Sequence, residues 1–165
     1  MNKHYLILCV DDEREVLEAV LHDLAPFRSH FELDGAESVD EAREVVHEWE
    51  REGGRLALIL CDHIMPGTLG VDFLVELNRR SATRASRKLL LTGQAGLEAT
   101  IEAVNRGGLH YYLAKPWKLE SLQEAVREQL TDYLLTEDGD HAFHYATVLN
   151  QARLFAAIHD HPFDE

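Results

Sequence analysis

The chain has 165 residues, of which 45% are hydrophobic and 28% charged, and its formal net charge is -14. This length suits one well-buried domain rather than two, and the composition is that of a globular protein rather than a disordered one. A strongly negative surface repels phosphate backbones and anionic lipids. We therefore expect neither nucleic acid nor a membrane as a direct partner.

The lack of a recognisable targeting signal and the placement of the cysteines favour a reducing compartment. No apolar run approaches the roughly 18–20 residues of a membrane-spanning helix, and the N-terminus has no signal-peptide pattern. Cys9 and Cys61 each lie within an apolar run, which predicts buried free thiols rather than a disulfide framework. Together these features favour a cytoplasmic protein of bacterial type.

Five short apolar runs with strand-like character alternate with longer segments of helical periodicity. The predicted strands are residues 5–10, 30–34, 56–61, 88–92 and 110–114. The first, third and fourth are almost continuously apolar, as in parallel strands that are covered on both faces. The alternation predicts a doubly wound α/β fold, and five strands favour the flavodoxin-like order 2-1-3-4-5.

Polar side chains stand where several of these strands end. Asp11 and Asp12 follow the first strand, Asp62 follows the third, Thr92 closes the fourth and Lys115 follows the fifth. In doubly wound sheets, ligands bind outside the carboxyl ends of the strands. Packed carboxylates repel each other, and a hard cation such as Mg²⁺ with oxygen ligands relieves that repulsion.

Each of these residues can be given a chemical role. Asp62 is predicted to be a nucleophile that forms an acyl phosphate, with Asp11 and Asp12 holding the metal. Lys115 can supply positive charge and Thr92 a hydrogen bond to the phosphoryl group. Any one of them alone is more often structural, because an aspartate after a strand commonly caps a helix. Their joint occurrence at separate strand ends supports the hypothesis.

Four stretches carry a more specific pattern: LILCVDDE at 6–13, LILCDHIMPG at 58–67, LLLTG at 89–93 and YLAKP at 112–116. Over roughly residues 3–135 the chain resembles the receiver domain of bacterial response regulators, including the chemotaxis regulators. The resemblance implies that Asp62 takes a phosphoryl group from the phosphohistidine of a sensor histidine kinase. Such a domain catalyses only its own phosphotransfer and dephosphorylation.

The resemblance also implies a metal site and a switch. The Mg²⁺ ligands would be Asp11, Asp12, Asp62 and the main-chain carbonyl of Ile64. Thr92 and Tyr112 correspond to a pair that moves on phosphorylation and remodels the surface of the fourth helix, fifth strand and fifth helix, as a population shift between two packings. A plain packed aromatic is the alternative for Tyr112.

Three positions flank this chemistry. Ile64 and Gln94 stand where the family tunes hydrolysis of the acyl phosphate. An apolar Ile64 cannot orient an attacking water, which predicts a long-lived phosphorylated state. His63, directly after the acceptor, is interpreted as a surface histidine beside a polar cleft, with a local pH-sensitive group as the alternative.

Residues 136–165 extend beyond the predicted receiver domain of residues 1–135. A turn at 136–140 precedes a predicted helix from His141 to about His159, with one broad apolar face that includes Leu149 and Phe155. The extension is too short for a DNA-binding or catalytic output domain, which favours a single-domain regulator acting through protein contacts. It either folds back on its own domain or pairs with a second copy, in a homodimer formed through this extension and the surface of the fourth helix, fifth strand and fifth helix.

Two rival functions use similar residues. A haloacid-dehalogenase-like phosphohydrolase places its nucleophile and acid two apart after the first strand, whereas Asp11 and Asp12 are adjacent. A receiver that signals without phosphorylation is disfavoured, because every acidic and switch residue is present. Nucleotide binding by a phosphate loop has no support, since no Gly-x-x-x-x-Gly-Lys occurs.

Overall fold

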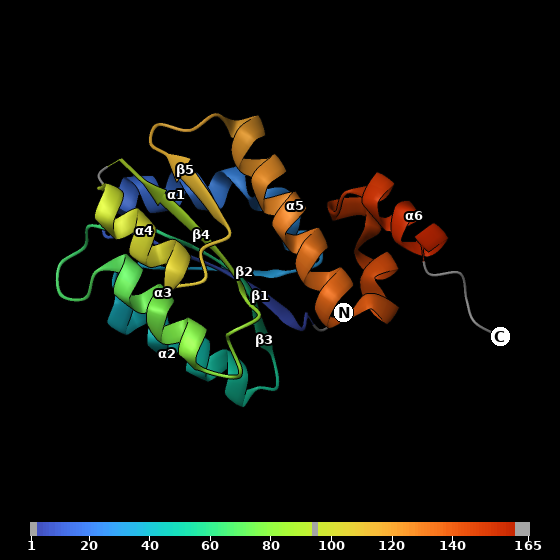
Figure 1. The fold of residues 1–165 in the computed structure, drawn as a ribbon, viewed down its shortest axis with the longest axis horizontal. Helices are drawn as coiled ribbons and strands as arrows, with labels where there is room; N and C mark the ends of the chain where they lie inside the picture. The colour runs from blue at the N-terminus through green and yellow to red at the C-terminus, as the bar shows by residue number, and fades with distance from the viewer. Residues whose placement is uncertain (1–2, 94–95, 161–165) are drawn as a thin grey trace.

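The computed structural model describes residues 3–93 and 96–160. Its parallel sheet has five strands in the order β2-β1-β3-β4-β5 (Figure 1). The strands are β1 (Tyr5–Val10), β2 (Glu32–Ala36), β3 (Arg55–Cys61), β4 (Arg87–Thr92) and β5 (Tyr111–Ala114). The α-helices are α1 (Arg14–Asp23), α2 (Val39–Arg51), α3 (Gly70–Arg79), α4 (Leu97–Asn105), α5 (Leu119–Glu137) and α6 (Gln151–Asp160), with 3-10 helices η1 (Ala25–Ser29) and η2 (Gly139–Val148). The predicted doubly wound, flavodoxin-like fold is confirmed.

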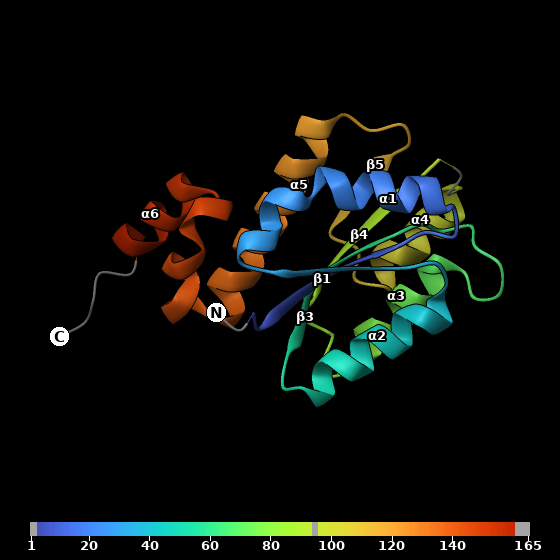
Figure 2. The same ribbon diagram turned by 180° about the vertical axis from the view of Figure 1, so that it is seen from behind.

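Helices cover both faces of the sheet. α1 and α5 lie on one face, and α2, α3 and α4 lie on the other (Figures 1 and 2). Ile7 of β1 packs in the first layer with Leu17 and Val126, while its neighbour Leu8 packs in the second layer with Phe73. Each fully buried side chain of this kind contributes about 1.5–3 kcal/mol, which explains why the central strands are continuously apolar. Among the described residues, no helix combines the length and the apolar character needed to cross a membrane.

The predicted strand positions hold to within a residue except at β2. This strand was expected at residues 30–34 and lies at Glu32–Ala36, because η1 continues into a turn before it. The amide of Phe31 donates to the carbonyl of Phe27 at 3.0 Å, and the Phe31 side chain is buried in the core. Cys9 and Cys61 are buried free thiols, as predicted.

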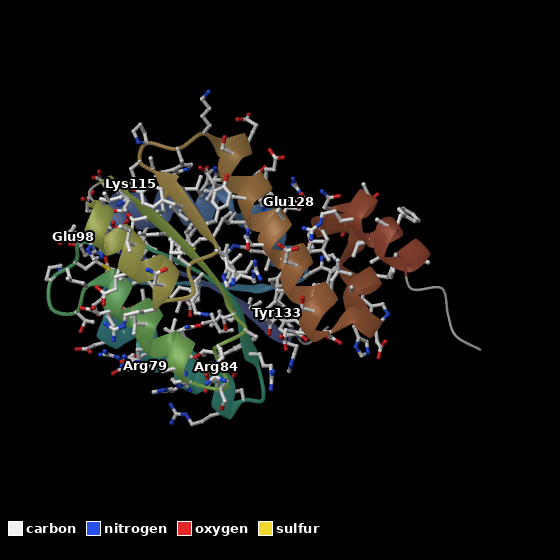
Figure 3. The ribbon with its side chains drawn as sticks, viewed as in Figure 1. Arg79, Arg84, Glu98, Lys115, Glu128 and Tyr133 are labelled. Carbon is white, nitrogen blue, oxygen red and sulfur yellow. The ribbon has the colours of Figure 1, made fainter. Side chains whose placement is uncertain are left out.

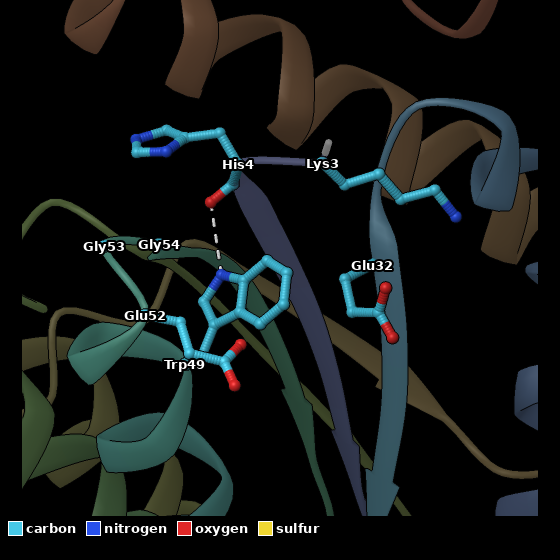
Figure 4. A pocket seen from close by; sticks show the side chains of 7 residues that line it. All are labelled: Lys3, His4, Glu32, Trp49, Glu52, Gly53 and Gly54. Atoms are coloured by element: carbon cyan, nitrogen blue, oxygen red, sulfur yellow. Dashed lines mark hydrogen bonds between the residues drawn. The ribbon is translucent and has the colours of Figure 1, made fainter. Parts of the chain in front are cut away.

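A hollow of about 620 Å³ opens at the amino edge of the sheet (Figure 4). On its wall, the indole Nε1 of Trp49 donates to the carbonyl of His4 at 3.1 Å. Gly54 lies against this indole, and a Cβ there would come within 2.2 Å of Nε1. These contacts fix the turn between α2 and β3 onto β1, at the edge opposite the polar strand ends.

The C-terminal extension differs from its predicted form. Instead of one helix from His141 to about His159, η2 is followed by a separate α6. Asn150 begins α6 anew, because its Oδ1 accepts from the amide of Arg153 at 3.1 Å. The restart changes the phase of the helix. Leu154 is therefore buried and Phe155 is 59% exposed, although Phe155 was expected on the buried face.

This extension packs on its own domain. Its buried side chains Ala142, Val148, Leu149 and Leu154 belong to the same core cluster as α5. Arg153 pairs with Asp132 and, at 2.8 Å, with Glu128 of α5, the latter labelled in Figure 3. Near the start of the extension, the hydroxyl of Tyr5 donates to Asp138 at 2.7 Å. The structure thus has the fold-back arrangement.

Candidate functional site

The acidic residues predicted from the strand ends converge at the carboxyl edge of the sheet. Val10 of β1 pairs with Cys61 of β3, so the residues that follow these two strands are neighbours. Carboxylate oxygens of Asp11, Asp12 and Asp62 all lie within 4.8 Å of one another. Asp11 and Asp62 are buried, whereas Asp12 is exposed and leaves the cluster open to solvent on one side.

Lys115 joins the two buried carboxylates. Its Nζ lies 2.7 Å from Oδ2 of Asp11 and 3.4 Å from Oδ2 of Asp62; Figure 3 labels Lys115 after β5. Burial raises the pKa of Asp11, even though the ammonium of Lys115 opposes this. Burial alone would lower the pKa of Lys115, but its hydrogen bonds and charge interactions with Asp11 and Asp62 outweigh burial and raise it. The lysine is therefore firmly cationic.

Backbone amides fix the other oxygen of each buried carboxylate. Oδ1 of Asp62 accepts from the amide of His63 at 2.8 Å, and Oδ1 of Asp11 accepts from the amide of Glu13 at 2.9 Å. With both Oδ1 atoms held in this way, both Oδ2 atoms face the ammonium. The three aspartates thus form an acidic pocket, with the ammonium of Lys115 on one side of it.

His63 is not a surface histidine, so that interpretation is wrong. The side chain is only 6% exposed, and its Nδ1 accepts from the amide of Val71 at 3.4 Å. The loop between β3 and α3 folds the imidazole against the first turn of α3, which removes it from solvent. The strand-end pattern carried no signal for this placement.

Gly70 is a site residue that the sequence reasoning missed. Its amide donates to the carbonyl of His63 at 2.9 Å, and a Cβ at this position would lie 1.8 Å from the carbonyl oxygen of Asp62. Only glycine lets the start of α3 approach the acceptor strand this closely. A glycine as the first residue of the helical pattern after the Met-Pro-Gly stretch was the available signal.

The remaining predicted residues lie around this pocket. Thr92 ends β4 and is buried, while Tyr112 of β5 is 38% exposed and its hydroxyl donates to the carbonyl of Thr92 at 3.4 Å. Ile64 is 47% exposed in the loop after Asp62. Gln94, the second flanking position, lies outside the described residues. The proposed switch residues are thus in direct contact across neighbouring strands.

The fold and the site together define a doubly wound α/β domain with an acidic pocket and a lysine at the carboxyl edge of its sheet. The family model described as the response regulator receiver domain matches residues 7–127. The chain belongs to the response regulator receiver domain family.

Individual relatives agree with this assignment. The chain is 32% identical over 127 residues to the hydrogenase transcriptional regulatory protein HoxA of Cupriavidus necator, covering 77% of this chain and 24% of the relative. It is 27% identical to the chemotaxis protein CheY-3 of Vibrio cholerae, covering 76% of this chain and 92% of that one. The chain thus spans about a quarter of the HoxA relative, and nearly all of the CheY-3 relative.

Solved structures show the same fold. The signal receiver domain of an HD domain-containing protein from Pseudomonas fluorescens superposes with a TM-score of 0.71 at 22% identity, covering 84% of this chain and 95% of that chain. At this level of identity the likeness concerns the fold alone.

Proposed function

We propose that this receiver domain accepts a phosphoryl group on Asp62 from the phosphohistidine of a sensor histidine kinase. The placement of Asp62 carries the proposal: its carboxylate is buried, with one oxygen fixed by the amide of His63 and the other 3.4 Å from the ammonium of Lys115. A fixed carboxylate beside a cation suits phosphoryl transfer, in which catalysis is mostly positioning and charge neutralisation.

The transfer forms an acyl phosphate. An oxygen of Asp62 bonds to phosphorus while the phosphorus–nitrogen bond of the donor breaks. The electron pair of that bond returns to the imidazole nitrogen, and the ring, protonated at its other nitrogen, leaves as neutral histidine. Later attack of water on phosphorus releases inorganic phosphate and restores the Asp62 carboxylate. These two steps are the whole of the proposed chemistry.

The site fits Mg²⁺ by the chemistry of its donors. Asp11, Asp12, Asp62 and the carbonyl of Ile64 would hold the ion, since Mg²⁺ prefers oxygen ligands and carboxylates. When bound, Mg²⁺ neutralises charge on the carboxylates and on the phosphoryl oxygens. Lys115, whose ammonium here lies between Asp11 and Asp62, would supply positive charge to the phosphoryl oxygens.

A switch in Thr92 and Tyr112 would report the phosphoryl group. The buried hydroxyl of Thr92 would move to the phosphoryl oxygens, and Tyr112 would follow into the space that it leaves. The contact of the Tyr112 hydroxyl with the main-chain carbonyl of Thr92 supports this coupling, because it places the Tyr112 side chain against Thr92. The shift is between two packings of the same elements.

The output is proposed to be a protein contact, made by a cytoplasmic regulator in which residues 1–135 form the receiver and residues 136–165 its extension. Along α4, three apolar side chains one turn apart are exposed: Leu97 at 77%, Ile101 at 48% and Val104 at 54%. Tyr111 and Tyr112 of β5, the next strand along the chain, are also exposed, at 42% and 38%. An apolar patch of this kind marks an interaction surface, and homodimerisation through it is the proposed output.

Intact mass after incubation with acetyl phosphate tests the proposal. We expect one added phosphoryl mass in the presence of Mg²⁺, and none without Mg²⁺ or in Asp62→Asn. Asp140→Asn, a matched change at an exposed aspartate of the extension, should be modified like wild type. If no phosphoryl donor adds mass to the wild-type protein, the phosphoacceptor role is wrong.

A further inference from the structure

We infer that His63 is a positioning residue of the phosphoacceptor site, and that its imidazole acts as the missing N-terminal cap of α3. The inference rests on the proposed role of Asp62 as acceptor. It concerns a side chain that neither the acceptor chemistry nor the metal site uses, although it is almost completely buried beside both.

Three hydrogen bonds converge on this one residue. The amide of His63 donates to Oδ1 of Asp62 at 2.8 Å, and its carbonyl accepts from the amide of Gly70 at 2.9 Å. Its Nδ1 accepts from the amide of Val71 at 3.4 Å. His63 thus connects the acceptor carboxylate on one side to the first two residues of α3 on the other.

The imidazole supplies a contact that α3 otherwise lacks. The residue before the helix, Leu69, has no side chain that can accept a hydrogen bond, and no side-chain cap is formed there. The first amides of a helix have no partner within the helix, and leaving one buried and unpaired destabilises the structure. The Val71 contact is buried, so Nδ1 of His63 takes the place of the usual serine or aspartate cap. An accepting Nδ1 requires the neutral ring with its proton on Nε2.

The three hydrogen bonds of His63 determine where the Asp62 carboxylate and the Ile64 carbonyl lie. Residues 64–69 form a loop whose two ends are joined by the His63 contacts, and the carbonyl of Ile64 lies within it. Gly70 is already pressed against the Asp62 carbonyl, so α3 cannot shift without moving the acceptor strand. Loss of the imidazole contact therefore loosens both the Asp62 carboxylate and the Ile64 carbonyl. A displacement of about 1 Å at a reacting group can slow a reaction by about a hundredfold.

Two substitutions separate the hydrogen bond from simple packing. His63→Leu fills a similar space without an acceptor, whereas His63→Asn places its amide oxygen where Nδ1 lies. His47→Leu makes the same chemical change at an exposed histidine of α2 and serves as the control. For each protein we would measure hydrogen exchange of the Val71 amide, Mg²⁺ affinity by calorimetry, and the rate of phosphorylation by acetyl phosphate.

We expect His63→Leu to exchange the Val71 amide at least about tenfold faster, to bind Mg²⁺ more weakly and to be phosphorylated about 10- to 100-fold more slowly. His63→Asn should return all three towards wild type, and His47→Leu should change none. A wild-type phosphorylation rate in His63→Leu, or a His63→Asn protein as impaired as His63→Leu, would overturn the inference. Exchange and Mg²⁺ affinity are read without phosphorylation, so failure of Asp62 to accept a phosphoryl group is distinguishable from failure of this inference.

Discussion

The ammonium of Lys115 lies 2.7 Å from Asp11 and 3.4 Å from Asp62, so one cation is shared by two buried carboxylates from different strands. This sharing connects the ends of β1, β3 and β5. We therefore predict that a divalent cation can replace the ammonium of Lys115 in stabilising the fold, but not in phosphoryl transfer.

Lys115→Met tests this division. Removing the ammonium leaves two neighbouring carboxylates without compensation, and we expect the free energy of unfolding to fall by about 2 kcal/mol without metal, less than for fully buried pairs because the lysine is partly exposed. Added Mg²⁺ should restore much of this stability while phosphorylation stays at least tenfold slower. Urea unfolding with and without Mg²⁺ checks the first part. A loss of stability that Mg²⁺ does not relieve would contradict the shared-cation account.

Gly70→Ala should disturb the acceptor through its backbone. The new Cβ would lie 1.8 Å from the Asp62 carbonyl, and relieving this clash should lower the free energy of unfolding by about 1–3 kcal/mol and slow phosphorylation. Gly96→Ala is the control, since Gly96 also lies at the start of a helix, as the N-cap of α4, and a Cβ there meets nothing within 4 Å. Thermal unfolding and acetyl phosphate labelling of both variants provide the comparison. Equal behaviour of the two variants would argue against close packing at Gly70.

Lys88 gives the fold a defined pH dependence. It is fully buried, its Nζ donates to the carbonyls of Thr83, Arg84 and Ser86, and burial lowers its pKa to about 8. In the unfolded chain a lysine has a pKa of about 10.4, so between roughly pH 8 and 10.4 the unfolded state binds more protons than the folded state. Stability from this residue therefore rises with pH across that range, by up to about 3 kcal/mol.

Comparison of wild type with Lys88→Met isolates this effect from other titrating groups. We expect the difference in unfolding free energy, wild type minus variant, to increase from pH 8 to pH 10.4 and to be constant between pH 6 and pH 7. Guanidinium unfolding at a series of pH values measures it. A difference that stays flat would mean that the lysine retains its ordinary pKa when buried, and one that falls with pH would mean that folding raises this pKa.

Alanine substitutions at two neighbouring residues of α6 should change the free energy of unfolding by very different amounts. Leu154→Ala removes a side chain that is 1% exposed and should lower the free energy of unfolding by about 2–4 kcal/mol. Phe155→Ala, at 59% exposure, should change it by less than about 0.5 kcal/mol. Sedimentation of the same two proteins reports whether Phe155 contacts a second copy. If Phe155 were the more damaging site, the phase of α6 would be that of the uninterrupted helix.

We predict that Ile64 lengthens the lifetime of the acyl phosphate. Its exposed apolar side chain cannot orient water, so we expect Ile64→Asn, which can, to shorten the half-life of phosphorylated protein by about tenfold. Decay of the added mass after removal of acetyl phosphate measures both proteins. A wild-type half-life of only seconds, unchanged in Ile64→Asn, would end this hypothesis.

Most of the site could be predicted from the sequence, because its residues directly follow the carboxyl ends of the strands. Apolar runs locate the strands, and parallel strands bring Asp11, Asp62 and Lys115 to one edge whatever the details of the loops. His63 was not predictable in the same way: whether its ring faces solvent or α3 depends on how the loop of residues 64–69 closes. That closure depends on the Gly70 contact with the acceptor strand, which no periodicity encodes.

The extension shows a different limit. Its apolar residues fit one long helix, and the periodicity alone favoured that. A single polar side chain, Asn150, resets the helix by capping it, and the partner of its own amide, Thr131 Oγ1 on α5 at 3.0 Å, is known only from the fold. Local patterns therefore predicted that the segment is helical, while a tertiary contact determined which face is buried.

The two members of the central ion pair are 104 residues apart in the chain. During synthesis, Asp11, Asp12 and Asp62 are therefore added to the chain before Lys115. Until β5 has been synthesised and has docked on the sheet, the three carboxylates lack the ammonium of Lys115. We therefore expect susceptibility to phosphoryl donors to arise only after β5 has docked on the sheet, so that a partly synthesised receiver cannot be phosphorylated.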